Sequence, residues 1–263
     1  MKTRSFSIYL LVAASFLLAP LAVVVMTAFN AGDFAVFPPE GWSLRWITAV
    51  PSNRAFMDAL LLSVQIALVT TVLTLAVALP AGYALARRRF RGRRLVEIGG
   101  LGPLAVPEIV VGLSIFVFYA GFLRLESGVG MLILGHAVVG IPIALQVLIA
   151  TFASLGNDLE EAAVTLGASP LKVFRRVTLP LVWPGAVGAA LLVFIFSFDN
   201  ISISLFLTSP GRVTLPVQMY QYLDYRADPS VAAMSGCLVA VGLVIFLLAN
   251  KLGALRHMAG GKA

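Results

Sequence analysis

Two carboxylates interrupt long apolar stretches of this chain, and they are the residues best suited to chemistry. Glu108 follows Pro107 in "LAVPEIVVG", and Asp199 precedes Asn200 in "FSFDNISIS". A carboxylate at the centre of a membrane helix costs roughly 2.5–3.5 kcal/mol, so it is tolerated where it faces a polar cavity or a partner. There it attracts an ammonium group strongly. The pair indicates recognition of a cation; the alternative for each is a structural hydrogen bond to kinked backbone or between helices.

The neighbours of these acids complete a candidate solute pathway. Phe198 is placed for a cation–π contact, although aromatic residues at such spacings also serve as core. We place five residues on the pathway: Asp199, Glu108, Phe198, Asn200 and Tyr119. No arrangement of Ser, His and carboxylate supports hydrolysis, and His136 and His257 lack metal-ligand spacing. We therefore expect no catalytic residue and no metal site.

A second polar stretch, "EEAAVTLGASPLKVFRRVTLP", covers residues 160–180. Asn157 or Asp158 can cap a helix whose first turn carries Glu160 and Glu161, as the helix dipole favours. Gly167 is placed to stop that helix. The sequence predicts a short polar helix with small residues beside two acids, a face that another helix or protein surface can approach closely.

A second helix start follows at once. Ser169 is a candidate N-cap and Pro170 a candidate first helical residue, and Pro180 and Pro184 are expected to close the element before the next apolar run. We expect two short helices at an angle, lying on the inner surface of a membrane. An ordinary amphipathic linker is the alternative.

The composition decides the class of protein. Of 263 residues, 60% are hydrophobic and 12% charged, and the mean hydropathy is +0.97. A soluble domain typically has about 25% charged residues, so this chain is an integral membrane protein. The net charge of +7 is concentrated in "ARRRFRGRR" after an apolar run, which is typical of a cytoplasmic loop. A nucleic-acid partner is not expected, and contact with membrane lipid is.

Six apolar runs are long enough to be spanning helices, since a span needs about 20 residues. They lack the alternation of strands, so we predict an all-α polytopic protein in one transmembrane domain, 1–263. The first run is longer than a signal peptide's apolar core, and we expect it to be retained. The spans are 6–29, 57–86, 95–123, 129–152, 185–208 and 231–252, with the polar stretch in a loop at 153–184.

Lys and Arg set the orientation, because they gather on the cytoplasmic side. They are dense in the flanks at 87–94, 153–184 and 251–263 and sparse in the loops at 30–56 and 209–230. Both termini and the polar stretch are therefore predicted to be cytoplasmic. The two outer loops carry Trp and Tyr residues suited to a membrane interface, or to contact with an external protein.

The polar stretch resembles the EAA loop of permease subunits of binding-protein-dependent ABC importers. That signature is Glu-Ala-Ala, three residues, Gly, nine residues, Ile, one residue and Leu-Pro, and here Val177 replaces Ile. The resemblance implies a coupling element that docks into a separate ATPase subunit. The docking and anchoring residues it implies are Glu160, Glu161, Ala162, Ala163, Gly167, Ser169, Pro170, Leu179 and Pro180.

Several further segments, among them "SNRAFMDALLLSVQIA" and "FSFDNISISLFLTSPGRVTLPVQMY", are similar to the spermidine/putrescine-type branch of that family. The resemblance implies the six-helix fold of type I importers in a bacterial inner membrane. It implies two ATPase copies, a second homologous permease chain and a periplasmic or extracellular solute-binding protein. This chain has no G-x-x-x-x-G-K-[ST] loop, so ATP and Mg²⁺ would be bound by the ATPase partners, and no cofactor by this chain.

Other functions remain open. The solute could be another small molecule, such as an amino acid derivative, an opine or iron. A stand-alone secondary transporter would need an inverted repeat, which the two halves do not show. An intramembrane enzyme would need a catalytic pair, and only Glu108 and Asp199 are available.

Overall fold

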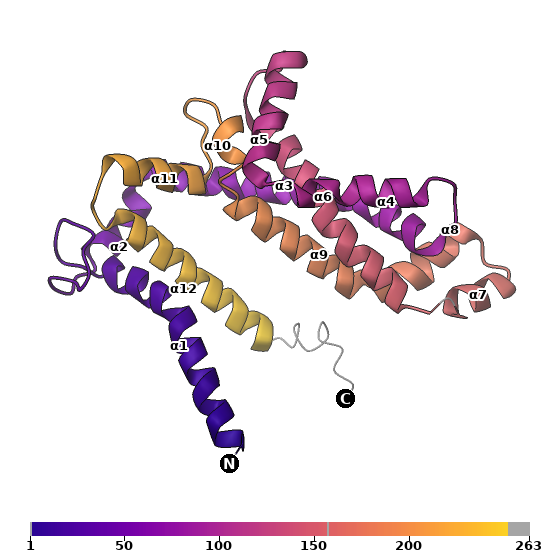
Figure 1. The fold of residues 1–263 in the computed structure, drawn as a ribbon, viewed down its shortest axis with the longest axis horizontal. Helices are drawn as coiled ribbons and strands as arrows, with labels where there is room; N and C mark the ends of the chain where they lie inside the picture. The colour runs from indigo at the N-terminus through magenta and orange to yellow at the C-terminus, as the bar shows by residue number, and fades with distance from the viewer. Residues whose placement is uncertain (1, 157, 252–263) are drawn as a thin grey trace. The chain divides into compact units, whose positions relative to one another are not determined.

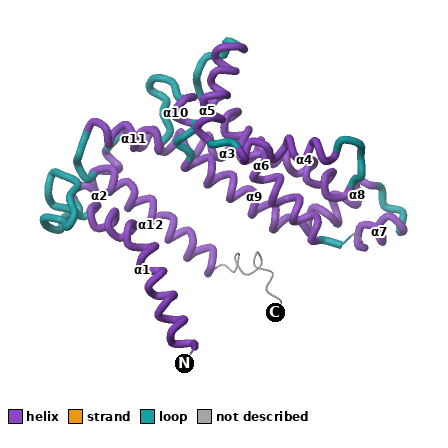
Figure 2. The backbone as a smooth tube through the Cα atoms, in the orientation of Figure 1, coloured by secondary structure: helices purple, strands orange, loops and turns teal. Residues whose placement is uncertain are grey.

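The computed structural model describes residues 2–156 and 158–251. Apart from two isolated β-bridges, the regular structure in these ranges is helical (Figures 1 and 2). The predicted all-α class is confirmed. The chain divides into two compact units. One holds the described residues up to Asp58 and those from Gln218 onward, and the other holds Ala59–Val217.

The first unit is built around α1 (Lys2–Ala28) and α12 (Ser230–Lys251), which pack against each other, with α2 (Arg45–Ala49) and η1 (Val50–Ser52) also against α12. A Cβ on Gly236 would lie 3.3 Å from that of Ala28, so the glycine lets the two helices approach closely. Most of the apolar side chains described along α1 are exposed, as expected of a helix that meets lipid or a partner subunit.

Asp228 caps the start of α12. Its carboxylate accepts hydrogen bonds from the Ser230 amide and the Tyr222 hydroxyl. Burial favours the neutral acid, but these bonds and the charge of Arg226 outweigh it and hold the pKa of Asp228 below its ordinary value.

The second unit is centred on α6 (Val129–Ser154) and α9 (Leu179–Asp199), which lie side by side (Figure 1). Part of α3 (Arg54–Arg87) joins them, and a buried apolar cluster that includes Ala78, Leu148 and Val193 links the three helices. At Gly140 a Cβ would come within 3.0 Å of Thr74 and 3.3 Å of Val193. The missing side chain thus lets α6 approach both neighbours, which is typical of membrane helix packing.

A bent helix pair and further short helices complete this unit. After α3 come α4 (Arg93–Leu101), η2 (Gly102–Ala105), α5 (Glu108–Phe116) and the π-helix η3 (Val117–Phe122). After α9 come α10 (Ser204–Leu207) and the start of α11 (Leu215–Tyr225). The amide of Leu215 donates to Ser63 Oγ at 2.7 Å, which ties the start of α11 to α3.

Within the described ranges, four helices are long and apolar enough to span a membrane: Phe6–Ala28, Arg54–Arg87, Val129–Ser154 and Pro170–Asp199. The expected span at 95–123 is not one continuous helix, because the chain bends by 103° between Arg93–Ala105 and Glu108–Phe122. The bend falls at Val106, which is extended because Pro107 follows it. This bent pair can form a fifth span. The apolar part described in α12, Ser230–Ile245, is shorter, so the count of six stays a prediction.

The predicted fifth span, 185–208, does not coincide with one helix. The helix α9 already begins at Leu179 and ends at Asp199, and a turn at residues 200–203 separates it from α10. Pro180 falls in the first turn of α9, where its missing N–H costs nothing, and Pro184 lies within the helix. These prolines therefore do not separate the polar stretch from the span.

The polar stretch contains α7 (Asp158–Thr165), α8 (Pro170–Val173) and the π-helix η4 (Phe174–Thr178). The stop at Gly167 is confirmed: its φ is +84°, its amide donates to the Val164 carbonyl, and the amide of Ala168 donates to the Ala163 carbonyl. That is a Schellman motif. Ser169 and Pro170 begin α8 as predicted, but α8 continues through η4 into α9, so it is not a separate short helix.

Candidate functional site

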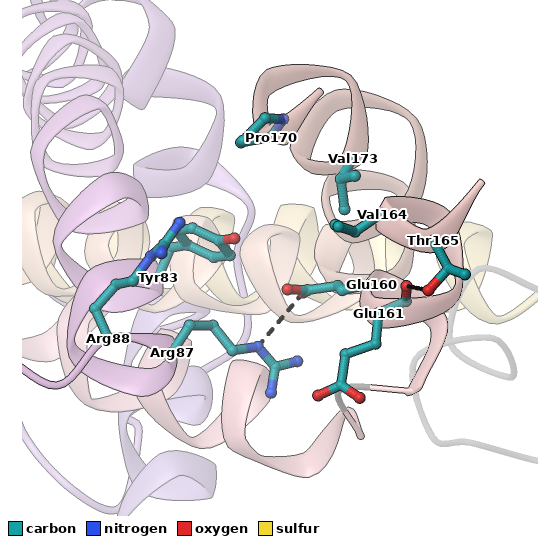
Figure 3. Close-up of a pocket in the computed structure, with 9 residues that line it drawn as sticks. All are labelled: Tyr83, Arg87, Arg88, Glu160, Glu161, Val164, Thr165, Pro170 and Val173. Carbon is teal, nitrogen blue, oxygen red and sulfur yellow. Dashed lines mark hydrogen bonds and ion pairs between the residues drawn. The ribbon is translucent and has the colours of Figure 1, made fainter. Parts of the chain in front are cut away.

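A cavity of about 580 Å³ lies between the end of α3 and the helices α7 and α8 (Figure 3). We call it the α7 cavity. Four of its lining side chains are charged: Arg87 and Arg88 from α3 and the following residue, and Glu160 and Glu161 from α7. The remaining lining residues are Tyr83, Val164, Thr165, Pro170 and Val173.

Glu160 is turned toward its own chain. Its Oε1 accepts a hydrogen bond from Thr178 Oγ1 at 3.0 Å and lies 3.4 Å from Arg87 Nε (Figure 3). The Glu160 and Arg87 side chains are only 17% and 10% exposed. A terminal nitrogen of Arg87 also reaches the Gly156 carbonyl at 3.5 Å. One carboxylate thus connects α7 to both α3 and the π-helix that leads into α9.

Aromatic contacts also hold the end of α3 against α6 and η4. Tyr83, one helical turn before Arg87, meets Phe152 of α6 edge to face at 5.6 Å and Phe174 of η4 at 5.1 Å between ring centroids. Such pairs contribute about 0.5–1.5 kcal/mol beyond the area they bury. The end of α3 therefore holds η4 through apolar contact as well as charge.

Most of the other predicted docking residues are exposed. Glu161 is exposed, and its carboxylate makes no hydrogen bond or ion pair with another residue of the described ranges. Ala162 and Gly167 are also exposed, and Ala163 is half-buried. Ser169, Pro170 and Pro180 are exposed, whereas Leu179 packs on the core shared by α3, α6 and α9.

Glu108, a predicted pathway residue, contacts Asn200 where two helices are interrupted. Glu108 is the first residue of α5, directly after the bend, and Asn200 directly follows the last residue of α9. The Asn200 amide nitrogen donates to Glu108 Oε2 at 2.8 Å. At Gly112, a Cβ would lie 3.0 Å from the Ser202 carbonyl and from Ile203 Cα, so α5 packs directly on the 200–203 turn.

Asn200 belongs to a larger set of buried polar residues. Ser204 Oγ donates to the Asn200 carbonyl at 2.7 Å, and His136 Nε2 lies 3.0 Å from Ser204 Oγ. His136 Nδ1 lies 2.7 Å from Ser197 Oγ. We call Glu108, His136, Ser197, Asn200 and Ser204 the polar junction. It joins α5, α6, α9, the 200–203 turn and α10 by hydrogen bonds.

The three remaining pathway residues are not part of this junction. Asp199 is exposed at the end of α9 and has no hydrogen bond or ion pair within the described residues. Phe198 stacks on Phe194 of its own helix, with ring centroids 6.1 Å apart. Tyr119 contacts Phe118 in η3 and packs on the apolar cluster around Ile115.

The sequence did not pair Arg87 or Thr178 with Glu160. It favoured packing or an interhelical hydrogen bond for His136, which the structure confirms, but did not identify the partners Ser197 and Ser204. The signal for Arg87 was present, since it is the first arginine after an apolar run, but nothing in the sequence pairs it with Glu160. Ser197 and Ser204 are seven residues apart, which is about two turns of an α-helix. In a continuous helix they would therefore lie on the same face. The break after Asp199 makes them converge on His136 instead.

Metal chemistry has no support in the described residues, which contain no group of three or more His, Cys, Asp or Glu able to hold an ion.

Long apolar helices, a bend at Pro107 and Glu108 and a short polar helix before a span indicate a polytopic membrane protein. The particular family follows from sequence comparison. Residues 78–254 match the family described as "Binding-protein-dependent transport system inner membrane component". The chain belongs to this family and is an inner-membrane permease subunit of an ABC importer.

Curated relatives agree over most of the chain. It is 32% identical over 247 residues to the putrescine transport system permease protein PotI of Escherichia coli K12, covering 91% of this chain and 88% of that one. It is 25% identical to the spermidine/putrescine permease PotC of the same strain, covering 89% and 88%. It is also 32% identical over 203 residues to the trehalose permease SugB of Mycobacterium tuberculosis, covering 73% and 72%.

Solved structures share the fold. A bacterial ABC transporter that imports the polysaccharide alginate has a chain that superposes with a TM-score of 0.68 at 18% identity, covering 95% of this chain and 94% of that one. An inward-facing MetNI methionine ABC transporter gives a TM-score of 0.62 at 18% identity, covering 81% and 99%. At these identities the likeness concerns the fold alone.

Proposed function

We propose that this permease subunit imports a small cationic amine of the polyamine class. The observation that carries the proposal is the Glu108 carboxylate, placed at a helix interruption and held by a neutral amide instead of a cation. Glu108 is exposed and has no cationic partner among the described residues, so its carboxylate is accessible to an ammonium group of a solute. The two polyamine permeases among the relatives support this choice of solute.

Asp199 is the second proposed contact. A polyamine carries at least two ammonium groups. Glu108 begins α5 after one helix break, Asp199 ends α9 before another, and Asn200 connects the two places, since it hydrogen bonds to Glu108 and directly follows Asp199. Phe198 and Tyr119 remain proposed wall residues of the pathway. One chain would supply half of that pathway, and a second homologous permease chain the other half.

The energy is proposed to come from partner subunits. Two ATPase copies would bind ATP and Mg²⁺, and their movement would reach this chain through the loop at 153–184, with Glu161, Ala162, Ala163 and Gly167 at the contact. This chain would bind no cofactor. A solute-binding protein would dock on the outer side, both termini would be cytoplasmic, and the whole chain would work as one transmembrane domain in the inner membrane.

A neutral solute is the second candidate, because the trehalose permease among the relatives is also 32% identical. The two candidates differ in what they require of the acids. A cationic solute needs the charge of Glu108, whereas a sugar needs only hydrogen-bond acceptors, which Gln also offers.

Uptake by cells that carry the complete transporter separates the candidates. With labelled putrescine, we expect saturable, ATP-dependent uptake, a large rise in KM for Glu108→Gln and a smaller rise for Asp199→Asn. Labelled trehalose serves as the neutral comparison. Uptake of trehalose but not putrescine, unchanged by Glu108→Gln, would contradict the proposed solute class.

A further inference from the structure

The polar junction has four neutral polar side chains, and three of them, His136, Ser197 and Ser204, have no part in the proposed function so far. His136 and Ser204 are fully buried, and Ser197 and Asn200 are 2% and 6% exposed. A polar group away from water costs free energy unless its hydrogen bonds are made. In a chain that is 60% hydrophobic, apolar residues would fill this space at lower cost.

The protons of the network can be assigned from its contacts. The single proton of Ser204 Oγ is directed to the Asn200 carbonyl, so the bond between Ser204 and His136 Nε2 needs the hydrogen on Nε2. In a neutral imidazole Nδ1 is then an acceptor, and it receives the hydroxyl proton of Ser197. Neutral His136 thus satisfies both nitrogens and joins α6 to α9 and α10.

The amide of Asn200 is fixed in the same way. Its Oδ1 accepts the Ile203 amide at 2.8 Å, and its nitrogen donates to Glu108 Oε2 at 2.8 Å. A flipped amide would place its oxygen against the carboxylate and its NH₂ against the Ile203 N–H, losing both bonds. The turn at 200–203 therefore decides that a donor faces Glu108.

We infer that Asn200 is a positioning residue for the Glu108 carboxylate, and that His136 holds the 200–203 turn so that Asn200 keeps this orientation. Among the described residues only Asn200 hydrogen bonds to the carboxylate. The amide engages one oxygen without neutralising the charge, and the other oxygen is left for an ammonium group of the solute. The inference rests on the proposed cationic solute.

Asn200 and the α7 cavity lie at opposite ends of α9, so movement at the cavity can reach Glu108. Asn200 follows the last residue of α9, and Thr178, which binds Glu160 in the α7 cavity, precedes the first. A helix of this length is about 30 Å long. A displacement of α7 passed along α9 would move Asn200 and so change how Glu108 is held.

The test measures labelled putrescine uptake by the complete transporter, with KM and maximal rate separated and membrane abundance checked by immunoblot. A hydrogen bond to a charged group is worth about tenfold or more in binding. Asn200→Ala should raise KM by about that factor with little change in abundance. His136→Leu should also raise KM, whereas His136→Gln, which can bridge two hydroxyls, should stay closer to wild type.

Two further variants serve as controls for this test. Thr70→Val is the matched control, because Thr70 is a buried polar residue of α3 whose hydroxyl has no hydrogen-bond partner in the described structure; KM should not change. The exchange Glu108→Gln with Asn200→Asp keeps one amide and one carboxylate in contact. It should transport better than Glu108→Gln alone.

The outcomes separate the two proposals. If the wild-type transporter imports putrescine and Glu108→Gln raises KM, unchanged KM in Asn200→Ala and His136→Leu overturns the positioning role alone. A loss of abundance in both variants and in His136→Gln, with KM unchanged, would make the network purely structural. No putrescine uptake by the wild-type transporter would overturn the solute class and the inference that rests on it.

Discussion

The α7 cavity and the polar junction hold a glutamate in opposite ways. In the cavity, Glu160 is joined by an arginine and a threonine, so its charge is compensated within the chain. In the junction, Glu108 is joined by an asparagine, so its charge is oriented but not compensated. The difference indicates that the first acid connects parts of this protein, whereas the second is kept for something that arrives from outside.

The neighbouring acids sharpen this contrast. Glu161 follows Glu160 and is exposed in α7, and Asp199 precedes Asn200 and is exposed at the end of α9. In each region an internally bonded side chain stands next to a carboxylate without a partner in the described residues. Each region therefore has one residue that fixes local structure and one that is available to a second molecule.

The largest effect is expected from Glu161→Lys. If the exposed carboxylate meets an ATPase subunit, charge reversal removes the attraction and adds repulsion, and transport should be lost while the chain still inserts. Uptake and co-purification with the ATPase measure this. Asp158→Lys reverses another exposed acid of the same helical turn and is the control. Full transport by Glu161→Lys would remove Glu161 from the docking surface.

Gly167→Asp should have the next largest effect. The φ of +84° at this position strains any residue with a Cβ, at roughly 1–2 kcal/mol, and the Schellman motif that ends α7 depends on it. We expect a severalfold fall in transport per ATP hydrolysed. Gly167→Asn is the conservative comparison, because Asn adopts this conformation more readily and should retain more activity. Equal activity of both variants would show that the geometry at the end of α7 is unimportant.

Glu160→Gln tests the internal connection. The amide can still accept the Thr178 proton, but the ion pair with Arg87 is lost. Because the two side chains are largely covered, we expect a two- to fivefold fall in transport per ATP, with ATPase binding retained, in line with roughly 0.5–1 kcal/mol. Asp158→Asn removes a first-turn charge without that contact and should have less effect. If the two variants behave alike, Glu160 contributes only to the helix dipole.

The smallest effect is expected from Gly112→Ala. The added methyl group would lie 3.0 Å from the Ser202 carbonyl and Ile203 Cα, so α5 or the turn must shift by a few tenths of an ångström. We expect the stability of the folded protein to fall by about 1 kcal/mol and KM to rise modestly. Gly99→Ala on α4, which meets nothing within 4 Å, is the control. Unchanged KM would mean that the junction tolerates movement.

The sequence predicted the helical class and the stop of α7 at Gly167, because a left-handed glycine acts locally. It did not predict that the run at 95–123 bends by 103° at Val106, or that α9 ends at Asp199. Proline and polar residues were visible there, but whether they kink or end a helix depends on what packs against them, here Gly112 on the turn.

Among the site residues too, the sequence singled out individual side chains but not the partners that they contact. Glu108 stands out in the sequence because an acid in an apolar run is costly. Its partner Asn200 was named only as a neighbour of Asp199, and His136 was not linked to either. The hydrogen bonds of the polar junction join residues 61, 68 and 92 positions apart and depend on tertiary structure. No local pattern reports them.

The end of α9 has an electrostatic consequence. The last four carbonyl groups of a helix have no partner within it, and the aligned peptide dipoles leave about half a negative charge at that end. Here that end coincides with Asp199 and lies beside Glu108 through Asn200. Three sources of negative potential therefore converge where the helix stops. An anion approaching this point would be repelled before any side chain touched it, and a diamine would be drawn in from a distance.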